Sequence, residues 1–260
     1  MRRLIAFPCA GETLLGTLDD AAGATGLLIV SGGNEIRSGA HRGMAELAGA
    51  LANAGVPVFR FDRRGIGDST GENHGYLGSA PDIAAAAATF VAEAGLTRLV
   101  GFGNCDAASA LALFHAAAGL DALVLANPWT GGTDDALPAA AAIRSRYAAK
   151  LRSPREWLRL ARGGVNLSKL VKGLRKVAAS RSEENASLVA RIAAGVAALP
   201  VTILLAERDN TAIAFADAWA KLPAPPALPI ERLDSASHSF ASVTDKAWLK
   251  ARLLEVVRAH

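Results

Sequence analysis

Cysteine, methionine and aromatic residues are scarce in this chain. Its 260 residues include two cysteines, two methionines and 5% aromatic residues, although 51% of the chain is hydrophobic. Two cysteines, Cys9 and Cys105, cannot form the network of bridges that holds small secreted domains together, so we expect a reducing compartment. No cluster of histidine, cysteine and acidic residues has the spacing of metal ligands, so we expect no metal site.

Long hydrophobic runs are also missing. No 18-residue window is free of polar residues, whereas a membrane-spanning helix needs about 20 apolar residues. The apolar stretch near the basic N-terminus contains Pro8 and ends at Gly11, which is too short for a secretory signal. We therefore expect a cytoplasmic protein that forms one large domain, or one domain with an insertion.

The glycine-rich segments match no phosphate-binding motif. Neither G-x-x-x-x-G-K-[ST] nor a G-x-G-x-x-G that follows a strand is present. We therefore expect no nucleotide cofactor, and indeed no cofactor of any kind. No nucleic-acid partner is expected either.

Charge is unevenly distributed. The chain has a formal net charge of +4, yet residues 144–181 contain twelve lysines and arginines against one acid, Glu156. Such a basic segment attracts phosphates, anionic membranes or acidic proteins such as acyl carrier proteins. The alternative is a solvated helix surface without a partner.

Short β-rich runs alternate with longer runs of alanine and leucine. This alternation predicts a mostly parallel sheet flanked by helices, opened by an antiparallel hairpin. The predicted strands are 4–8, 13–18, 27–30, 58–61, 99–102, 123–126, 201–206 and 230–233. The predicted helices are 44–54, 82–94, 107–118, 212–221 and 243–259.

The alternation stops between two of the strands. Residues 131–198 contain amphipathic helical patterns and no clear strand, which indicates a helical cap inserted into a core of residues 1–130 and 199–260.

The most informative motif is Gly103-Asn104-Cys105-Asp106-Ala107, between a predicted strand and a predicted helix. This is the setting in which α/β-hydrolases hold their nucleophile, usually a serine in G-x-S-x-G. Small flanking residues are needed because the central residue adopts a strained conformation. Cys105 is therefore the candidate nucleophile, although a lone cysteine after a strand is also common in a hydrophobic core.

A cysteine nucleophile needs a base, and the base needs an acid that orients it. Asp209 follows a predicted strand and His238 lies in the loop after the last strand, the order found in this fold. Loops at the carboxyl ends of parallel strands meet at one edge of the sheet. Glu207 is the competing acid and Asp234 a weaker one, and Asp209 also suits a helix N-cap.

An oxyanion hole is predicted from the backbone amides of Asp106 and Gly33. Asp106 follows the nucleophile at a helix N-terminus, and Gly33 lies in the loop after the predicted strand 27–30. Asn34 in the same loop, His41 and Trp129 are candidate substrate-binding residues near these strand ends.

A second motif follows the predicted strand 58–61. Asp62-Arg63-Arg64-Gly65-Ile66-Gly67-Asp68-Ser69 matches D-x-R-G-x-G-x-S, which is common in this fold, and we expect a structural role for it.

Several segments together resemble the exosortase A system-associated hydrolases, type 1. The resemblance rests on residues 31–33, 38–42, 59–69, 105–110, 125–129 and 164–167. It implies an α/β-hydrolase fold, a hydrolase or acyl-transfer site, and a link to exopolysaccharide and exosortase systems. The triad of Cys, His and Asp is also similar to that of dienelactone hydrolases.

These observations predict an acyl hydrolase or acyltransferase that acts on an ester or thioester. Cys105 would attack the carbonyl, His238 would carry the proton and Asp209 would orient the imidazole. The basic segment would guide an anionic substrate, such as an acyl-CoA or an acyl carrier protein. The alternative is a non-catalytic protein that binds an anionic lipid or a polysaccharide-assembly partner through the same segment.

Overall fold

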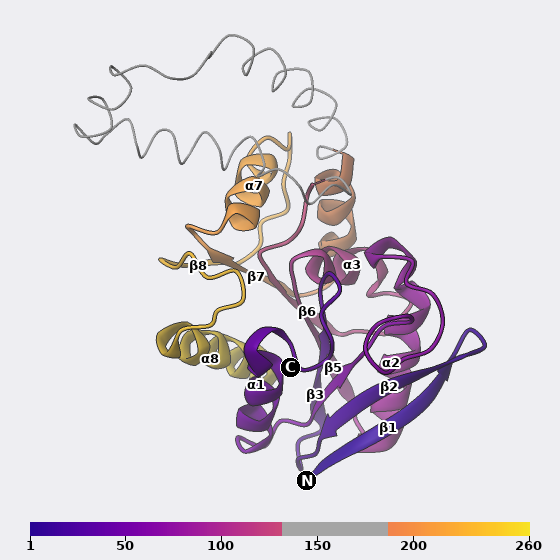
Figure 1. The fold of residues 1–260 in the computed structure, drawn as a ribbon. Helices are drawn as coiled ribbons and strands as arrows, with labels where there is room; N and C mark the ends of the chain where they lie inside the picture. Colours follow the sequence, from indigo (N-terminus) through magenta and orange to yellow (C-terminus); the bar gives the residue numbers. More distant parts are fainter. Residues whose placement is uncertain (132–186) are drawn as a thin grey trace, which may run out of the picture.

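The computed structural model describes residues 1–131 and 187–260, which form an eight-stranded sheet in the order β1-β2-β4-β3-β5-β6-β7-β8 (Figure 1). The strands are β1 Arg2–Cys9, β2 Glu12–Asp19, β3 Thr25–Val30, β4 Val58–Phe61, β5 Arg98–Asn104, β6 Ala122–Ala126, β7 Val201–Ala206 and β8 Ile230–Leu233. Each of the eight predicted strands is present, and several extend by a few residues at their ends.

Strand directions agree with the prediction of a mostly parallel sheet. β1 pairs antiparallel with β2, and β2 antiparallel with β4, whereas all pairs from β4 to β8 are parallel. The carboxyl ends of β3, β5, β6 and β7 therefore lie along one edge of the sheet. The loops that carry the candidate site begin there.

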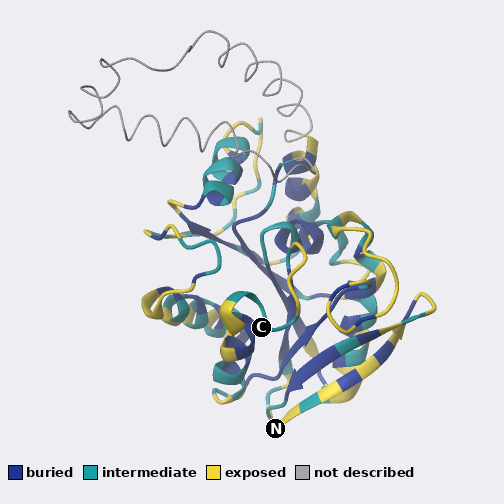
Figure 2. Ribbon diagram, viewed as in Figure 1, coloured by how far each residue is buried: buried dark blue, intermediate teal, exposed yellow. Residues whose placement is uncertain are grey.

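Helices cover both faces of the sheet (Figure 1). They are α1 Gly43–Ala52, α2 Ala80–Ala94, α3 Asp106–Phe114, α7 Asn210–Trp219 and α8 Val243–Ala259. α1 and α8 pack on one face in one apolar cluster, while α2, α3 and α7 belong to the cluster on the other face. The central strands β3, β4, β5, β6 and β7 are buried on both sides (Figure 2), as expected for parallel strands.

The predicted helix 107–118 ends earlier than its alanines indicate. α3 stops at Phe114, and the chain turns at Gly119, whose φ is +63°. The turn brings the buried side chain of Leu120 onto the core and lets the amide of Asp121 donate to the carbonyl of Leu99. Packing at the start of β6 thus overrides helix propensity.

Four phenylalanines fill the space beneath the hairpin. Phe59 lies 5.8 Å from Phe7 and 5.5 Å from Phe90, measured between ring centroids, and Phe61 also contacts Phe7. Gly16 on β2 leaves room for this cluster, because a Cβ there would lie 2.1 Å from Cζ of Phe59.

The predicted cap, residues 131–198, lies largely outside the described residues, as does the whole basic segment 144–181. Its last part is described: residues 187–195 are helical, and Leu188, Val189 and Ile192 are buried against the same cluster as α3. Within the described ranges, no helix has the length and hydropathy needed to cross a bilayer.

Replacing Phe59 with alanine tests the cluster beneath the hairpin. The side chain is fully buried, so Phe59→Ala should lower the free energy of unfolding by about 3–5 kcal/mol. Leu4→Ala on β1 is the matched control, since Leu4 is 69% exposed and its loss should change stability by less than about 0.5 kcal/mol. Chemical denaturation measures both, and equal effects would contradict the packing.

Candidate active site

Cys105 occupies a strained turn between β5 and α3. Its φ is 62° and its ψ −128°, a conformation that L-residues adopt when the surroundings enforce it. A Cβ on Gly103 would lie 2.7 Å from the backbone carbon of Ala107, so the strand and helix approach too closely for a larger residue. The motif's small residues therefore have the steric purpose expected from the sequence.

Asp209 and His238 lie together beside this turn. Nδ1 of His238 is 3.0 Å from Oδ2 of Asp209, and the imidazole also hydrogen-bonds to Cys105. Oδ2 of Asp209 accepts from the amides of Thr211 and Ala212, so the same residue caps α7. The two interpretations of Asp209, helix cap and partner of the histidine, thus hold at once.

The alternative acids have other partners. Oε1 of Glu207 lies 3.9 Å from Nη1 of Arg232, and Oδ1 of Asp234 lies 2.8 Å from Nε of Arg208. Both carboxylates are exposed at the surface, whereas the Asp209 side chain is 10% exposed. The geometry therefore favours Asp209 over Glu207 and Asp234 as the acid that orients His238.

The protonated form of His238 is strongly favoured. The hydrogen bond to Asp209, and after it the hydrogen bond to Cys105, raise the pKa of His238 to about 10, while burial opposes the shift. Both hydrogen bonds therefore favour the protonated imidazole over the neutral one.

Two asparagines hold the histidine loop against the strand ends. Nδ2 of Asn104 donates to the carbonyl of His238 at 3.0 Å, and Nδ2 of Asn127 lies 3.3 Å from the same oxygen. Asn127 is fully buried, and its Oδ1 accepts from the amide of Ala206 at the end of β7. β5, β6, β7 and the histidine loop are thereby joined by side-chain amides.

The predicted oxyanion loop lines the same pocket as Cys105, and one of its amides already has a partner. The amide of Gly33 donates to Oδ1 of Asp106 at 2.6 Å. The side chain of Asp106 therefore reaches across to the loop whose amide was predicted to bind the substrate oxygen.

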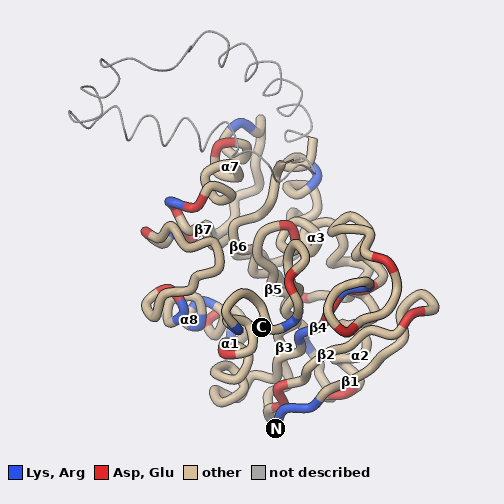
Figure 3. Tube along the Cα trace, in the orientation of Figure 1, with Lys and Arg blue, Asp and Glu red and all other residues tan. Residues whose placement is uncertain are grey.

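A network of charges fixes this loop. Asp62 accepts from the amide of Arg37 at 2.6 Å and pairs with its guanidinium, and Arg63 donates to the carbonyl of Gly33. Arg60, which is paired with Asp19, donates to the carbonyl of Arg37 at 2.7 Å. Acidic and basic segments accordingly lie next to one another around β3 and β4 (Figure 3). The second motif has the structural role expected for it, because its Asp62 and Arg63 hold the loop after β3.

A small pocket of about 130 Å³ opens at Cys105. It is lined by the oxyanion loop, His238 and residues of β3 and β5, including Gly32, Gly33, Phe102 and Asn104.

The three predicted substrate-binding residues lie outside this lining. Asn34 accepts a hydrogen bond from Asn73, His41 is exposed, and Trp129 donates its backbone amide to the carbonyl of Cys105. Their contact with substrate stays a prediction.

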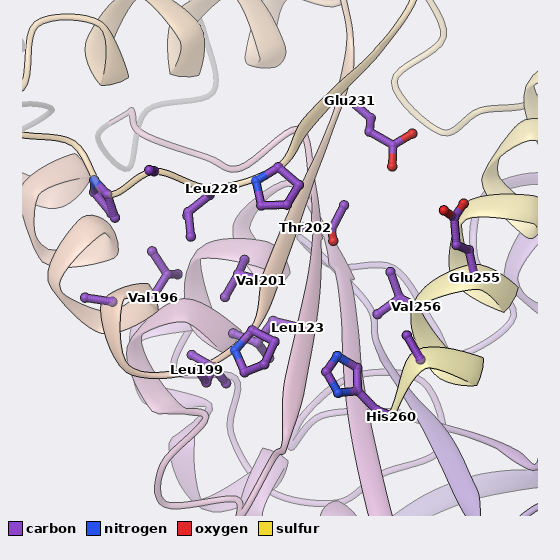
Figure 4. Close-up of a pocket in the computed structure, with 16 residues that line it drawn as sticks. Leu123, Val196, Leu199, Val201, Thr202, Leu228, Glu231, Glu255, Val256 and His260 are labelled. Carbon is purple, nitrogen blue, oxygen red and sulfur yellow. The ribbon is translucent and has the colours of Figure 1, made fainter.

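A larger hollow of about 740 Å³ lies at the opposite edge of the sheet (Figure 4). Val201 at the beginning of β7, Leu199, Leu228 and Val256 line it, with His260 at its rim. None of the triad residues reaches this hollow. Across residues 1–131 and 187–260, no group of three or more His, Cys, Asp or Glu is arranged to bind a metal ion.

Sequence reasoning missed the asparagine pair and the reach of the Asp106 side chain. Asn104 is part of the turn motif and Asn127 directly follows a predicted strand, so both were visible at strand ends. Their partner is a backbone carbonyl on a distant loop, which no sequence pattern marks.

Replacing Asp209 with asparagine tests the charge of His238. Asparagine keeps the helix cap but removes the charge, so the pKa of His238 should fall from about 10 toward its ordinary value of about 6.5. Because folding raises the pKa of His238, proton binding to the imidazole stabilises the folded state fully below pH 6.5. This stabilisation is lost as the pH rises through 10. The stability gap between wild type and Asp209→Asn should therefore narrow over that range.

An NMR titration of the imidazole and denaturation at pH 6 and above 10 measure the two effects. A wild-type pKa near the ordinary value would contradict the described hydrogen bonds.

Replacing Asn127 with alanine tests the asparagine pair. The change leaves the buried amide of Ala206 without its acceptor, so we expect a loss of about 1–3 kcal/mol in the free energy of unfolding. Asn53→Ala, at an exposed helix end, should cost less than about 0.5 kcal/mol. Faster hydrogen exchange of the Ala206 amide in Asn127→Ala would confirm that its hydrogen bond is lost. Unchanged exchange would contradict this explanation.

Comparisons with known proteins agree with this architecture. The model of the alpha/beta hydrolase family matches residues 27–249. None of the curated proteins matches the chain.

Many solved structures share the fold, and three of them come from two hydrolases and a thioesterase domain. The alpha/beta hydrolase GrgF from Penicillium sp. sh18 is 17% identical with a TM-score of 0.65, covering 100% of this chain and 99% of its own. A Pyrococcus furiosus esterase is 14% identical with a TM-score of 0.62, covering 100% and 92%. The thioesterase domain of the curacin biosynthetic pathway is 14% identical with a TM-score of 0.59, covering 98% and 99%. The family match includes Cys105, Asp209 and His238, and the chain belongs to the alpha/beta hydrolase family.

Proposed function

We propose that this protein hydrolyses or transfers an acyl group held as an ester or thioester, with Cys105 as nucleophile. The observation that carries the proposal is the chain of hydrogen bonds from Asp209 through His238 to Cys105, which ends at a strained turn. A protonated imidazole that donates to the sulfur favours the thiolate of a cysteine, which is its nucleophilic form.

Acylation begins with attack of the sulfur on the substrate carbonyl carbon. A carbon–sulfur bond forms and the carbonyl π electrons move to the oxygen, which the amides of Asp106 and Gly33 would stabilise. Collapse of this intermediate breaks the bond to the leaving alcohol or thiol, which takes the proton from Nε2 of His238. Asp209 holds the imidazole in position throughout.

Deacylation uses the neutral imidazole that remains. His238 takes a proton from water, or from an acceptor hydroxyl in a transfer reaction, and the oxygen attacks the thioester. The carbon–sulfur bond breaks and the sulfur leaves as thiolate beside the reprotonated imidazole. A thioester intermediate suits transfer as well as hydrolysis because thiolate leaves readily.

The substrate is proposed to be anionic. The basic segment 144–181 would attract an acyl-CoA, an acyl carrier protein, a lipid-linked saccharide or an anionic membrane surface. The resemblance to exosortase A system-associated hydrolases supports a proposed role in exopolysaccharide or exosortase systems.

Alkylation of Cys105 tests the nucleophile. Iodoacetamide reacts with thiolates, so wild-type protein should be alkylated rapidly at pH 6, where an ordinary free thiol with a pKa of about 8.5 hardly reacts. His238→Ala should slow this reaction by at least about tenfold, because the imidazolium partner of the sulfur is lost. Mass spectrometry of the modified peptide gives the rates.

Two controls separate the site from the rest of the chain. Cys105→Ala retains Cys9, whose thiol pKa burial and a hydrogen bond to Asp82 raise to about 11, so little labelling should remain. His260→Ala changes a histidine at the opposite edge of the sheet and should leave the rate unchanged. Slow alkylation of wild type, independent of His238, would overturn the proposal, whereas rapid alkylation justifies turnover assays with simple esters and acyl thioesters.

A further inference from the structure

The side chain of Asp106 lies where a substrate oxygen is expected. Its Oδ1 is 2.6 Å from the amide nitrogen of Gly33, a short charge-assisted hydrogen bond. A carboxylate in the first turn of a helix is ordinarily stabilised by the helix dipole. Here the hydrogen bond of the Asp106 carboxylate crosses instead to the loop after β3.

The surroundings are shaped for this contact. A Cβ on Gly32 would lie 2.8 Å from Oδ1 of Asp106 and 2.6 Å from the carbonyl oxygen of Asn104. Any residue larger than glycine at this position would collide with the carboxylate or with β5. The close approach of the loop, the strand end and the carboxylate therefore depends on the glycine.

The loop itself is held in place from its other side. Arg63, which is 3% exposed, donates to the carbonyl of Gly33, and Asp62 binds the backbone amide of Arg37 further along the loop. These two buried groups anchor the loop at Gly33 and at Arg37, although Gly33 itself is exposed. The Asp106 side chain is half-buried, so a rotation about its χ1 bond can return the carboxylate to solvent.

An oxyanion and a carboxylate cannot share one donor without repulsion. We propose that Asp106 closes the oxyanion hole of the free protein, and that a substrate carbonyl is activated only after the carboxylate leaves the amide of Gly33. The inference rests on the proposed function, since it concerns acyl transfer to Cys105. Asp106 would then determine specificity. Small esters bind too weakly to displace its carboxylate from the Gly33 amide, so they would react slowly.

Two reagents distinguish this gate from a general change in the nucleophile. Acylation of Cys105 by p-nitrophenyl acetate passes through an oxyanion and expels p-nitrophenolate. Alkylation by iodoacetamide forms the carbon–sulfur bond as iodide leaves from a tetrahedral carbon, and no oxyanion arises. Freeing the amide of Gly33 should therefore accelerate acylation by p-nitrophenyl acetate and leave alkylation by iodoacetamide unchanged.

The experiment compares wild type with Asp106→Ala, which clears the hole, and with Asp106→Asn, which is isosteric and uncharged. Because one oxyanion-hole donor is worth about 100-fold or more in rate, we expect the acylation rate to rise by at least about tenfold in Asp106→Ala. It should rise less in Asp106→Asn, whose amide oxygen can still accept from the Gly33 amide. Alkylation should change less than about twofold. Asp68→Asn is the charge control, since that carboxylate pairs with Arg37 and its side chain is 69% exposed.

The amide proton of Gly33 supplies a readout independent of activity. Loss of the charged acceptor should move its NMR signal upfield in Asp106→Ala, and the signal should stay in place in Asp68→Asn. Unchanged acylation with intact alkylation, or an unmoved Gly33 signal, would overturn the gate and leave the proposed function standing. A thiol inert to both reagents in every variant would overturn both.

Discussion

The close approach of α3 to β5 is the constraint on which the candidate site depends. The φ of 62° at Cys105 is tolerated because Gly103 lets the helix backbone lie directly against the strand. The same approach places the first turn of α3 beside the loop after β3, where Asp106 meets Gly33. A larger residue at Gly103 would move the helix, and with it Cys105 and Asp106, away from the loop after β3.

Polar groups, more than apolar packing, position the loops around this turn. The guanidinium groups of Arg60 and Arg63 are buried and bind backbone carbonyls of the oxyanion loop. Asn104 and Asn127 do the same for the histidine loop. A buried hydrogen bond to a carbonyl sets position and direction together, which an apolar contact does not. The two loops are thus held to the sheet by donors from its own strand ends.

Much of this could be predicted from the sequence because the signals are local. The alternation of strands and helices fixes the parallel sheet, and the order of Cys105, Asp209 and His238 along the chain brings them to one edge. The remaining contacts are set by packing across distant segments. The bond between Asp106 and Gly33 spans 73 residues, and the carbonyl of His238 lies 134 residues from Asn104. No spacing rule marks such pairs, and the helix end at Phe114 was likewise decided by the core rather than by propensity.

One oxygen atom of Asp209 connects the chemistry of the site to the end of a helix. Oδ2 receives the imidazole of His238 and the amides of Thr211 and Ala212 together. When the imidazole loses a proton, more of the negative charge on this oxygen becomes available to the two amides. The backbone amides in the first turn of α7 therefore respond to the protonation state of a histidine that lies 29 residues from Asp209 along the chain.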